Sequence, residues 1–171
     1  AAHARFPFAV IWDDHEVRND FSGPFDDRMP IGRQALREYW PIRVAADDPD
    51  RLYRTVRAGT DLEMFILDTR QYRSRNIDQD GPAKTMLGEK QLQWLLRGLT
   101  ESSAMWKVIV TTVPLSISKG GSASVPGNDG WAGGPGIPGF ERERQVIVDH
   151  ILGRKVKNVV FLAGDVHYVQ A

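Results

Sequence analysis

The sequence contains no cysteine, which excludes disulfides, thiolate catalysis and cysteine-ligated zinc sites within its 171 residues. It also has no excess of charge, because 22 lysines and arginines balance 22 aspartates and glutamates. Proteins that bind nucleic acid or membrane surfaces by bulk electrostatics carry a basic surplus, so neither partner is implied. No apolar run approaches the roughly 20 residues that span a bilayer.

Hydrophobic residues make up 42% of the chain and charged residues 26%, the balance of a globular protein with one core of ordinary size. Apolar and alternating runs predict strands, and apolar residues at helical spacing predict helices. We expect strands over 8–12, 52–58, 62–67, 106–113 and 158–163, and helices over 31–39, 88–99 and 141–152. Buried strands that alternate with helices indicate an α/β fold.

Polar clusters follow three of these strands, at residues 13–16, 68–70 and 164–167. In α/β sheets, sites gather beyond the carboxyl ends of the strands, so clusters far apart in sequence are expected to meet. Residues 116–139 form a long loop rich in glycine, serine and proline. Loops of this length are either functional or disordered.

The first cluster, Asp13-Asp14-His15-Glu16, places three carboxylates and an imidazole in consecutive positions. These groups are ligands of hard and borderline divalent cations, and their mutual repulsion favours a balancing cation. The alternative is a helix N-cap, because Asp caps well and Glu suits the first turn. The preceding strand and the imidazole favour a metal site.

The last cluster, Gly164-Asp165-Val166-His167, repeats this arrangement. If the backbone stays extended beyond Gly164, Asp165 and His167 face the same side and address one site. The alternative is an ordinary turn with an exposed Asp and His. Two strand-end Asp/His clusters in one chain favour the metal site.

Several segments, in order along the whole chain, resemble signature segments of PhoD-like phosphatases. They are the WDDHEV-x-N segment at 12–19, LDTR-x-YR at 67–73, LG-x-x-Q-x-x-WL at 87–95, the strand and loop at 106–109 and 113–116, DGW at 129–131, and NVVFLAGDVHY at 158–168. The resemblance implies a calcineurin-like metallophosphoesterase domain, in which two β-sheets pack between helices. Residues 1–171 would be a part of that domain, because metal-binding Asp residues of the family lie on two strands further upstream. Since the chain also begins and ends close to its sharpest motifs, we expect the domain to be incomplete at both ends.

The resemblance also implies roles for particular residues. Asp14, Asp165 and His167 stand at metal-ligand positions, and Asp13 is a weaker candidate, either as a ligand or as a partner that orients one. His15 stands where a histidine lies near the scissile phosphate. The metals typical of the family are iron and calcium. The broader superfamily has a further histidine after the strand over 106–113, where this chain has Thr111 and Thr112, as PhoD-like members generally do.

The implied function is metal-dependent hydrolysis of phosphate mono- or diesters through a multi-metal centre, in a protein exported from the cytoplasm. Since several cations at short spacing can hold a phosphate and generate a hydroxide, the residue types suit that chemistry. The alternative is a non-catalytic remnant of the fold that holds metal without hydrolysing anything.

Two arginines and two residues of the long loop each have two possible interpretations. Arg70 and Arg73 have the guanidinium groups that suit phosphate, but we expect Asp68 to pair with Arg70 or cap the strand. Asp129 and Trp131 lie in the long loop, where covering a substrate and flexible disorder are equally plausible.

Overall fold

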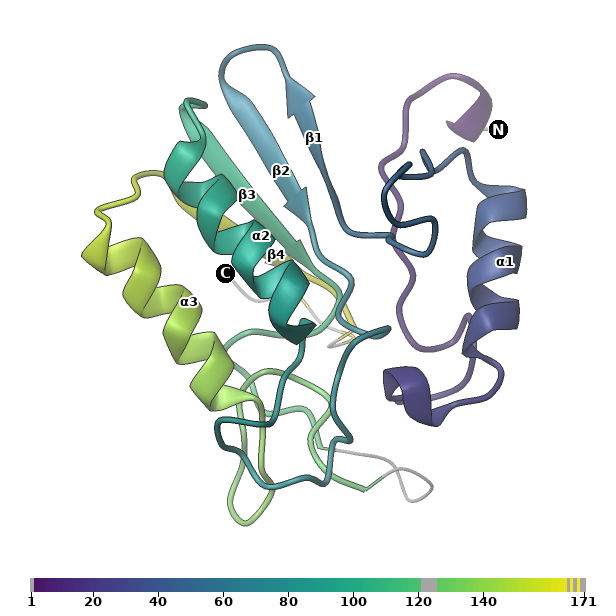
Figure 1. Ribbon diagram of the computed structural model, residues 1–171, viewed down its shortest axis with the longest axis vertical. Helices are drawn as coiled ribbons and strands as arrows, with labels where there is room; N and C mark the ends of the chain where they lie inside the picture. Colours follow the sequence, from purple (N-terminus) through teal and green to yellow (C-terminus); the bar gives the residue numbers. More distant parts are fainter. Residues whose placement is uncertain (1, 121–125, 166, 168, 170–171) are drawn as a thin grey trace.

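The computed structural model describes residues 2–120, 126–165, 167 and 169, and Figure 1 shows the arrangement of their helices and strands. In chain order these are η1 Ala2–Ala4, η2 Gly23–Phe25, α1 Met29–Tyr39, β1 Arg54–Ala58, β2 Leu62–Ile66, α2 Gly88–Glu101, β3 Trp106–Thr111, α3 Glu141–Gly153 and β4 Val159–Ala163. The expected α/β fold is confirmed. The ends of the long helices, and of the four strands that form, differ from the expected ones by at most two residues.

One four-stranded sheet has the order β1-β2-β3-β4. β1 and β2 form the expected antiparallel hairpin, and β2, β3 and β4 are parallel neighbours. The register places Phe65, Ile109 and Phe161 in one row across the parallel strands. Because the side chains of a strand alternate between faces, this row and its equivalents define the inner face of the sheet.

Helices α2 and α3 both cover this inner face (Figure 1). Each helix connects one parallel strand to the next in the same direction across the sheet. Such crossovers have a right-handed preference, so two successive ones place their helices on the same side.

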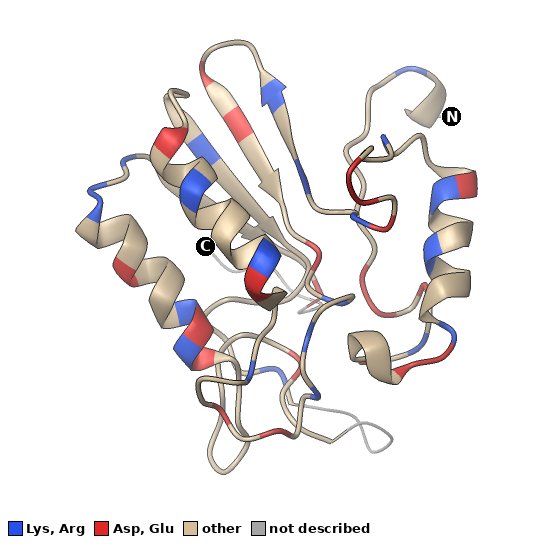
Figure 2. Ribbon diagram, viewed as in Figure 1, with Lys and Arg blue, Asp and Glu red and all other residues tan. Residues whose placement is uncertain are grey.

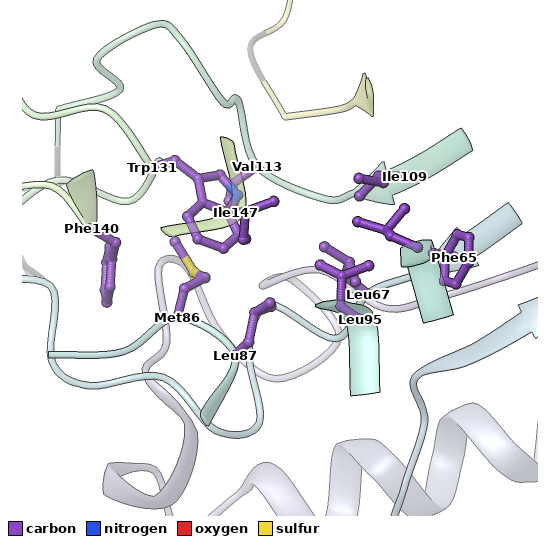
Figure 3. Packing of buried hydrophobic residues seen from close by; sticks show 11 residues of the cluster. Phe65, Leu67, Met86, Leu87, Leu95, Ile109, Val113, Trp131, Phe140 and Ile147 are labelled. Atoms are coloured by element: carbon purple, nitrogen blue, oxygen red, sulfur yellow. The ribbon is translucent and has the colours of Figure 1, made fainter. Parts of the chain in front are cut away.

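The main core lies between the sheet and these two helices (Figure 3). Leu95 and Leu99 of α2 and Ile147 of α3 pack against the row that contains Phe65 and Ile109. The core continues beyond the strand ends, where Met86, Leu87, Trp131 and Phe140 are buried. The long loop therefore contributes to the core instead of covering it from outside.

The opposite face of the sheet is apolar and partly exposed. Val160 and Leu162 of β4 point to this face with 37% and 54% exposure, and Trp106 of β3 with 46%. Among the described residues this is the only extended sheet, so the part of the chain that the structure covers supplies one of the two sheets that the resemblance implies.

A second, smaller core lies under α1 and consists of Trp12, Phe21, Leu36 and Leu52. The expected strand over 8–12 is wrong, since this segment forms no ladder with any described strand. Side chains connect it to the sheet region instead, since Arg54 Nη2 donates to the carbonyl of Val10 at 2.6 Å. An apolar run becomes a strand only where a partner backbone lies beside it.

Both signs of charge occur along each of α1, α2 and α3 (Figure 2). This interspersed pattern agrees with the zero formal net charge of the sequence. No helix among the described residues is long and apolar enough to cross a membrane.

Candidate metal centre

The first polar cluster forms a tight loop that is anchored by the residue before it, Trp12. Trp12 is completely buried and donates from its indole nitrogen to Asp68 Oδ1 at 2.9 Å, at the end of β2. The backbone then turns, with the amide of Val17 bonded to the carbonyl of Asp14. Buried Asp14 accepts the backbone N–H of Asp20 through Oδ2 at 2.9 Å. The alternative of a helix N-cap is wrong, because no helix starts in this cluster.

Helix α1 packs closely against this loop. Gly32 is its contact point, since a Cβ at this position would lie 2.6 Å from Val17 Cγ2 and 2.9 Å from the carbonyl oxygen of Glu16. Only a residue without a side chain permits such an approach. The position of α1 therefore helps to set the position of the Asp14–Glu16 turn.

Arg70 joins the three polar clusters in space. Its side chain has no exposed surface, and Nε and Nη2 donate to Asp13 Oδ1 at 2.8 and 2.7 Å. Nη1 and Nη2 also bind the carboxylate of Asp129 at 2.7 and 2.6 Å, and Nη2 lies 4.0 Å from Asp165. The expected convergence of the three polar clusters is thus confirmed.

The expected side-chain pair between Arg70 and Asp68 is wrong. Asp68 Oδ1 instead accepts the backbone N–H groups of Arg70 and Gln71 at 3.1 and 3.0 Å, so the strand-capping alternative is confirmed. A guanidinium that is completely buried needs carboxylates for its remaining donors, and the fold brings these from elsewhere in the chain.

Asp129 is completely buried between two arginines. Arg73 Nη1 donates to Asp129 Oδ1 at 2.8 Å, the same oxygen that accepts the bond from Arg70 Nη1. Burial alone would raise the pKa of Asp129, but Arg73 and Arg70 outweigh it and hold that pKa well below its usual range. Trp131 is also buried and donates to Thr111 Oγ1 at 3.0 Å. Both residues are therefore internal, so disorder of this part of the loop is wrong.

The two threonines that stand in place of the superfamily histidine have structural partners. Thr111 accepts the Trp131 bond just described, and Thr112 Oγ1 bonds to Thr69 Oγ1 at the end of the neighbouring strand. They tie the strand ends to each other and to the loop.

The backbone is not extended beyond Gly164, contrary to expectation. Asp165 and His167 both have positive φ angles, of 65° and 61°. Asp20, across the pocket, has a φ of 54°. Non-glycine residues in this region are strained, and such strain clusters at functional sites.

Asp165 and His167 nevertheless reach one pocket, of about 420 Å³, together with Asp14 and His15 of the first motif. Asp13, the weaker candidate, does not line this pocket. The side chains around it are those of Asp14, His15, Asn19, Asp20, Lys119, Asp165 and His167, with Gly120. A larger hollow of about 980 Å³ lies between the N-terminal segment and β1, but it lacks the converging strand-end groups. We therefore place the candidate site in the smaller pocket.

Two overlapping groups of carboxylates at this pocket suit a cation. Oxygens of Asp13, Asp14 and Asp165 lie within 4.8 Å of one another, and so do oxygens of Asp14, Asp20 and Asp129. Asp14 belongs to both groups. Hard cations take such oxygen donors, so the residues present fit a metal ion.

Burial and mutual repulsion make ionisation of some of these acidic groups less favourable. Burial raises the pKa of Asp165 to about 6, and the charges of Asp13 and Asp129 act in the same direction against the attraction of Lys119. Burial also raises the pKa of Asp13, in spite of its bonds to Arg70. A positive ion among these carboxylates would favour their ionised forms.

His15 differs from its neighbours in that its side chain is 77% exposed at the mouth of the pocket. Its Nε2 lies 3.1 Å from Asn19 Oδ1 and 3.9 Å from Asp14 Oδ2. The imidazole is therefore oriented from one side and accessible from the other.

Sequence reasoning missed Asp20 and Lys119. Asp20 lies six residues beyond Asp14 and gave no separate signal, while Lys119 lies 46 residues before Asp165 in a loop without recognisable structure. Nothing local marks either residue as part of the pocket.

Comparison with known proteins agrees with this arrangement of motifs. The family model of PhoD-like phosphatases matches residues 1–171. The chain belongs to the PhoD-like phosphatase family. Alkaline phosphatase D of Bacillus subtilis (strain 168) is 34% identical over 192 residues, an alignment that covers 98% of this chain and 32% of that protein.

A solved structure of PhoD matches 97% of this chain with a TM-score of 0.78 and 32% sequence identity. The match covers 35% of the length of that PhoD chain. The present chain therefore spans about a third of the PhoD-like relatives with which it is compared.

Proposed function

We propose that this chain forms part of a metal-dependent phosphoesterase that hydrolyses phosphate mono- or diesters. The observation that carries the proposal is the convergence of Asp14 and Asp165 with His15 and His167 on one pocket, although the two motifs are separated by almost the entire chain. Membership of the PhoD-like phosphatase family supports it.

Asp14, Asp165 and His167 would be metal ligands, with calcium and iron as the ions that the family resemblance suggests. Asp13 suits an orienting role better than direct binding, because its Oδ1 already accepts two bonds from Arg70. Such neighbours fix the orientation of ligands around a metal. When bound, the ions would hold the phosphate and lower the pKa of a coordinated water.

His15 would act on the leaving group. Its ring is exposed at the mouth of the pocket, and Asn19 fixes the ring at Nε2. A histidine in this place can protonate the leaving oxygen or stabilise the charge that develops on the phosphate. Strained backbone at Asp165 and Asp20 agrees with a preformed site.

A second candidate is a metal-binding remnant without hydrolytic activity. The carboxylate groups of the pocket would suit a cation in this case as well. In the enzyme hypothesis, residues 1–171 are part of a larger catalytic domain that has further metal-binding strands upstream. Export from the cytoplasm is a prediction from the family resemblance alone.

Metal binding tests the site first. The wild-type chain and the Asp165→Ala variant are exposed to calcium and iron, freed of excess metal and measured by elemental analysis. We expect metal in the wild type and its loss in the variant, with Asp149→Ala, an acidic residue on α3, as the matched control. Equal metal in Asp165→Ala and wild type would contradict the proposed site.

Hydrolysis separates the two candidate functions. The natural protein that contains this chain is assayed with p-nitrophenyl phosphate and bis(p-nitrophenyl) phosphate, before and after removal of metal. Turnover that is lost with the metal and in Asp165→Ala supports the enzyme. Metal binding without turnover of either ester supports the remnant.

A further inference from the structure

Lys119 brings a positive charge into the carboxylate pocket from the long loop. Its ammonium group forms an ion pair with Asp165 Oδ2 and lies 3.5 Å from Asp129 Oδ2 and 3.7 Å from Asp20 Oδ1. These three carboxylates come from three separate segments of the chain. The lysine side chain is 23% exposed, so it reaches inwards from the rim of the pocket.

The partners of Lys119 are the same carboxylates that suit a metal. Asp20 and Asp129 form one potential ligand group with Asp14, and Asp165 forms the other with Asp13 and Asp14. A lysine ammonium is a compact point charge without directional preference, so it can balance several carboxylates as a metal ion does. A metal and the ammonium group would therefore repel each other at this place.

The backbone at Lys119 is held by hydrogen bonds, whereas the side chain is partly exposed. The carbonyl of Lys119 accepts the amide of Asp129 at 3.0 Å, and Ser118 pairs with Ala132 in an isolated bridge. The side chain itself has a flexible four-carbon stem and an open pocket beside it. Rotation about the bonds of this stem would move the ammonium group towards solvent.

Arg70 differs from Lys119 in that its positive charge is fixed inside the same cluster. It is fully buried and makes paired bonds to Asp129 in addition to its bonds to Asp13. No solvent path leads its guanidinium out of the cluster. Only Lys119 combines ion pairs to the carboxylates with an exposed route, among the basic residues that the structure places at this pocket.

We propose that Lys119 is a tethered counter-ion, which balances the carboxylates of the metal-free protein and must withdraw when a metal ion binds. The inference rests on the proposed metal site and adds that this lysine sets the metal affinity. Removal of the charge raises that affinity and destabilises the metal-free protein, because Asp165 loses its ion pair and the neighbouring carboxylates repel it more strongly.

Calcium alone is the probe for the test, in the natural protein that contains this chain. Wild type, Lys119→Met and Lys119→Arg are freed of metal, and calcium binding is followed by calorimetry alongside thermal melting of the metal-free and calcium-loaded forms. Lys90→Met, an exposed lysine of α2, is the matched control.

We expect Lys119→Met to bind calcium about tenfold more tightly than wild type. Its metal-free form should melt at a lower temperature, so that calcium raises its melting temperature more than it does in wild type. Lys119→Arg keeps the charge and should retain the weaker calcium binding, and Lys90→Met should match wild type in both measurements. A melting shift in the metal-free form is a readout independent of enzyme activity.

The outcomes separate this inference from the proposed function. Calcium binding that depends on Asp165 but is unchanged or weaker in Lys119→Met overturns the inference and leaves the metal site standing. Binding in Lys119→Met with none in wild type supports the inference. Absence of binding in both proteins overturns the role of Lys119 together with the calcium site.

Discussion

The cluster around Arg70 and the pocket around Lys119 share carboxylates but differ in their contact with solvent. Arg70, Arg73 and Asp129 have no exposed surface and hold one another through short paired bonds. His15 and Lys119 lie on the open side of the same carboxylates, with side-chain exposures of 77% and 23%. One arrangement fixes the positions of the acidic groups, and the other leaves them accessible.

This difference shows how the fold can keep so many acidic groups near one point. The buried arginines compensate Asp129 and Asp13 permanently and tie the first motif to the long loop. Asp14 and Asp165 lie in the pocket itself, and Lys119 pairs with Asp165 there. Substitutions on the buried side should therefore change mainly stability, and those on the open side should change mainly binding and activity.

The largest loss of stability is expected for Asp129→Asn. It leaves two completely buried guanidinium groups without their common carboxylate, and breaking a buried ion pair in this way costs about 3–5 kcal/mol. Urea unfolding of the variant measures the loss, and Asp27→Asn, an exposed acidic residue, is the control. A loss below about 1 kcal/mol would show that the buried cluster does not hold the loop.

A smaller loss, about 1–3 kcal/mol, is expected for Gly32→Ala. The added methyl group meets Val17 and the carbonyl of Glu16, so α1 must move away from the turn that carries Asp14. The free energy of unfolding, measured with urea, and the metal content should both fall. Gly153→Ala is the matched control, because a Cβ there meets no atom within 4 Å. Equal effects of the two variants would contradict the role of α1 as a support for the motif.

Lys84 should make stability depend on pH at the edge of the buried cluster. Burial lowers its pKa to about 8 against the attraction of Asp80 and Asp78, and its ammonium group lies 4.3 Å from the ring of Phe140. In the unfolded chain the pKa returns to its ordinary value of 10.5. The native protein therefore holds fewer protons between these values, and stability rises with pH across that window.

The contribution of this lysine is at most about 1 kcal/mol per pH unit. Urea unfolding of wild type and Lys84→Met from pH 7 to 10 measures it as the difference between the two slopes. We expect the steeper rise in wild type. Parallel curves would mean that Lys84 is as well solvated in the folded protein as in the unfolded chain.

The smallest effect on stability, within about 0.5 kcal/mol, is expected for His15→Ala, because the side chain is exposed. Hydrolysis by the natural protein should nevertheless fall about 10²–10⁴-fold if His15 supplies the proton or stabilises charge. Metal content is measured in parallel and should not change. A variant with wild-type turnover would remove His15 from the proposed mechanism.

Hydrophobic periodicity was sufficient to locate most of the fold. The leucine stripe of α2 and the β-branched run of β3 place both elements within two residues of their ends. The sequence also indicated that polar motifs at strand ends would meet, and Asp14, His15, Asp165 and His167 do line one pocket. The roles proposed for them remain predictions.

Errors arose where the outcome depends on a partner that lies far away in sequence. Residues 8–12 have the composition of a strand but find no strand beside them among the described residues. Arg70 has Asp68 two residues away, yet its guanidinium binds Asp129, which is 59 residues further along the chain. The loop around Asp129 and Trp131 has the composition of a flexible segment and is partly core.

The sequence by itself thus determined the α/β class, the helices, the hairpin and the two acidic motifs, because these depend on periodicity and residue types within a few positions. Only the tertiary structure decided which charges are buried with which partners, and that Lys119 and Asp20 share the pocket with the predicted residues. The physical reason is that the cost of burying a charge is set by all the groups packed around it, and most of these come from other parts of the chain.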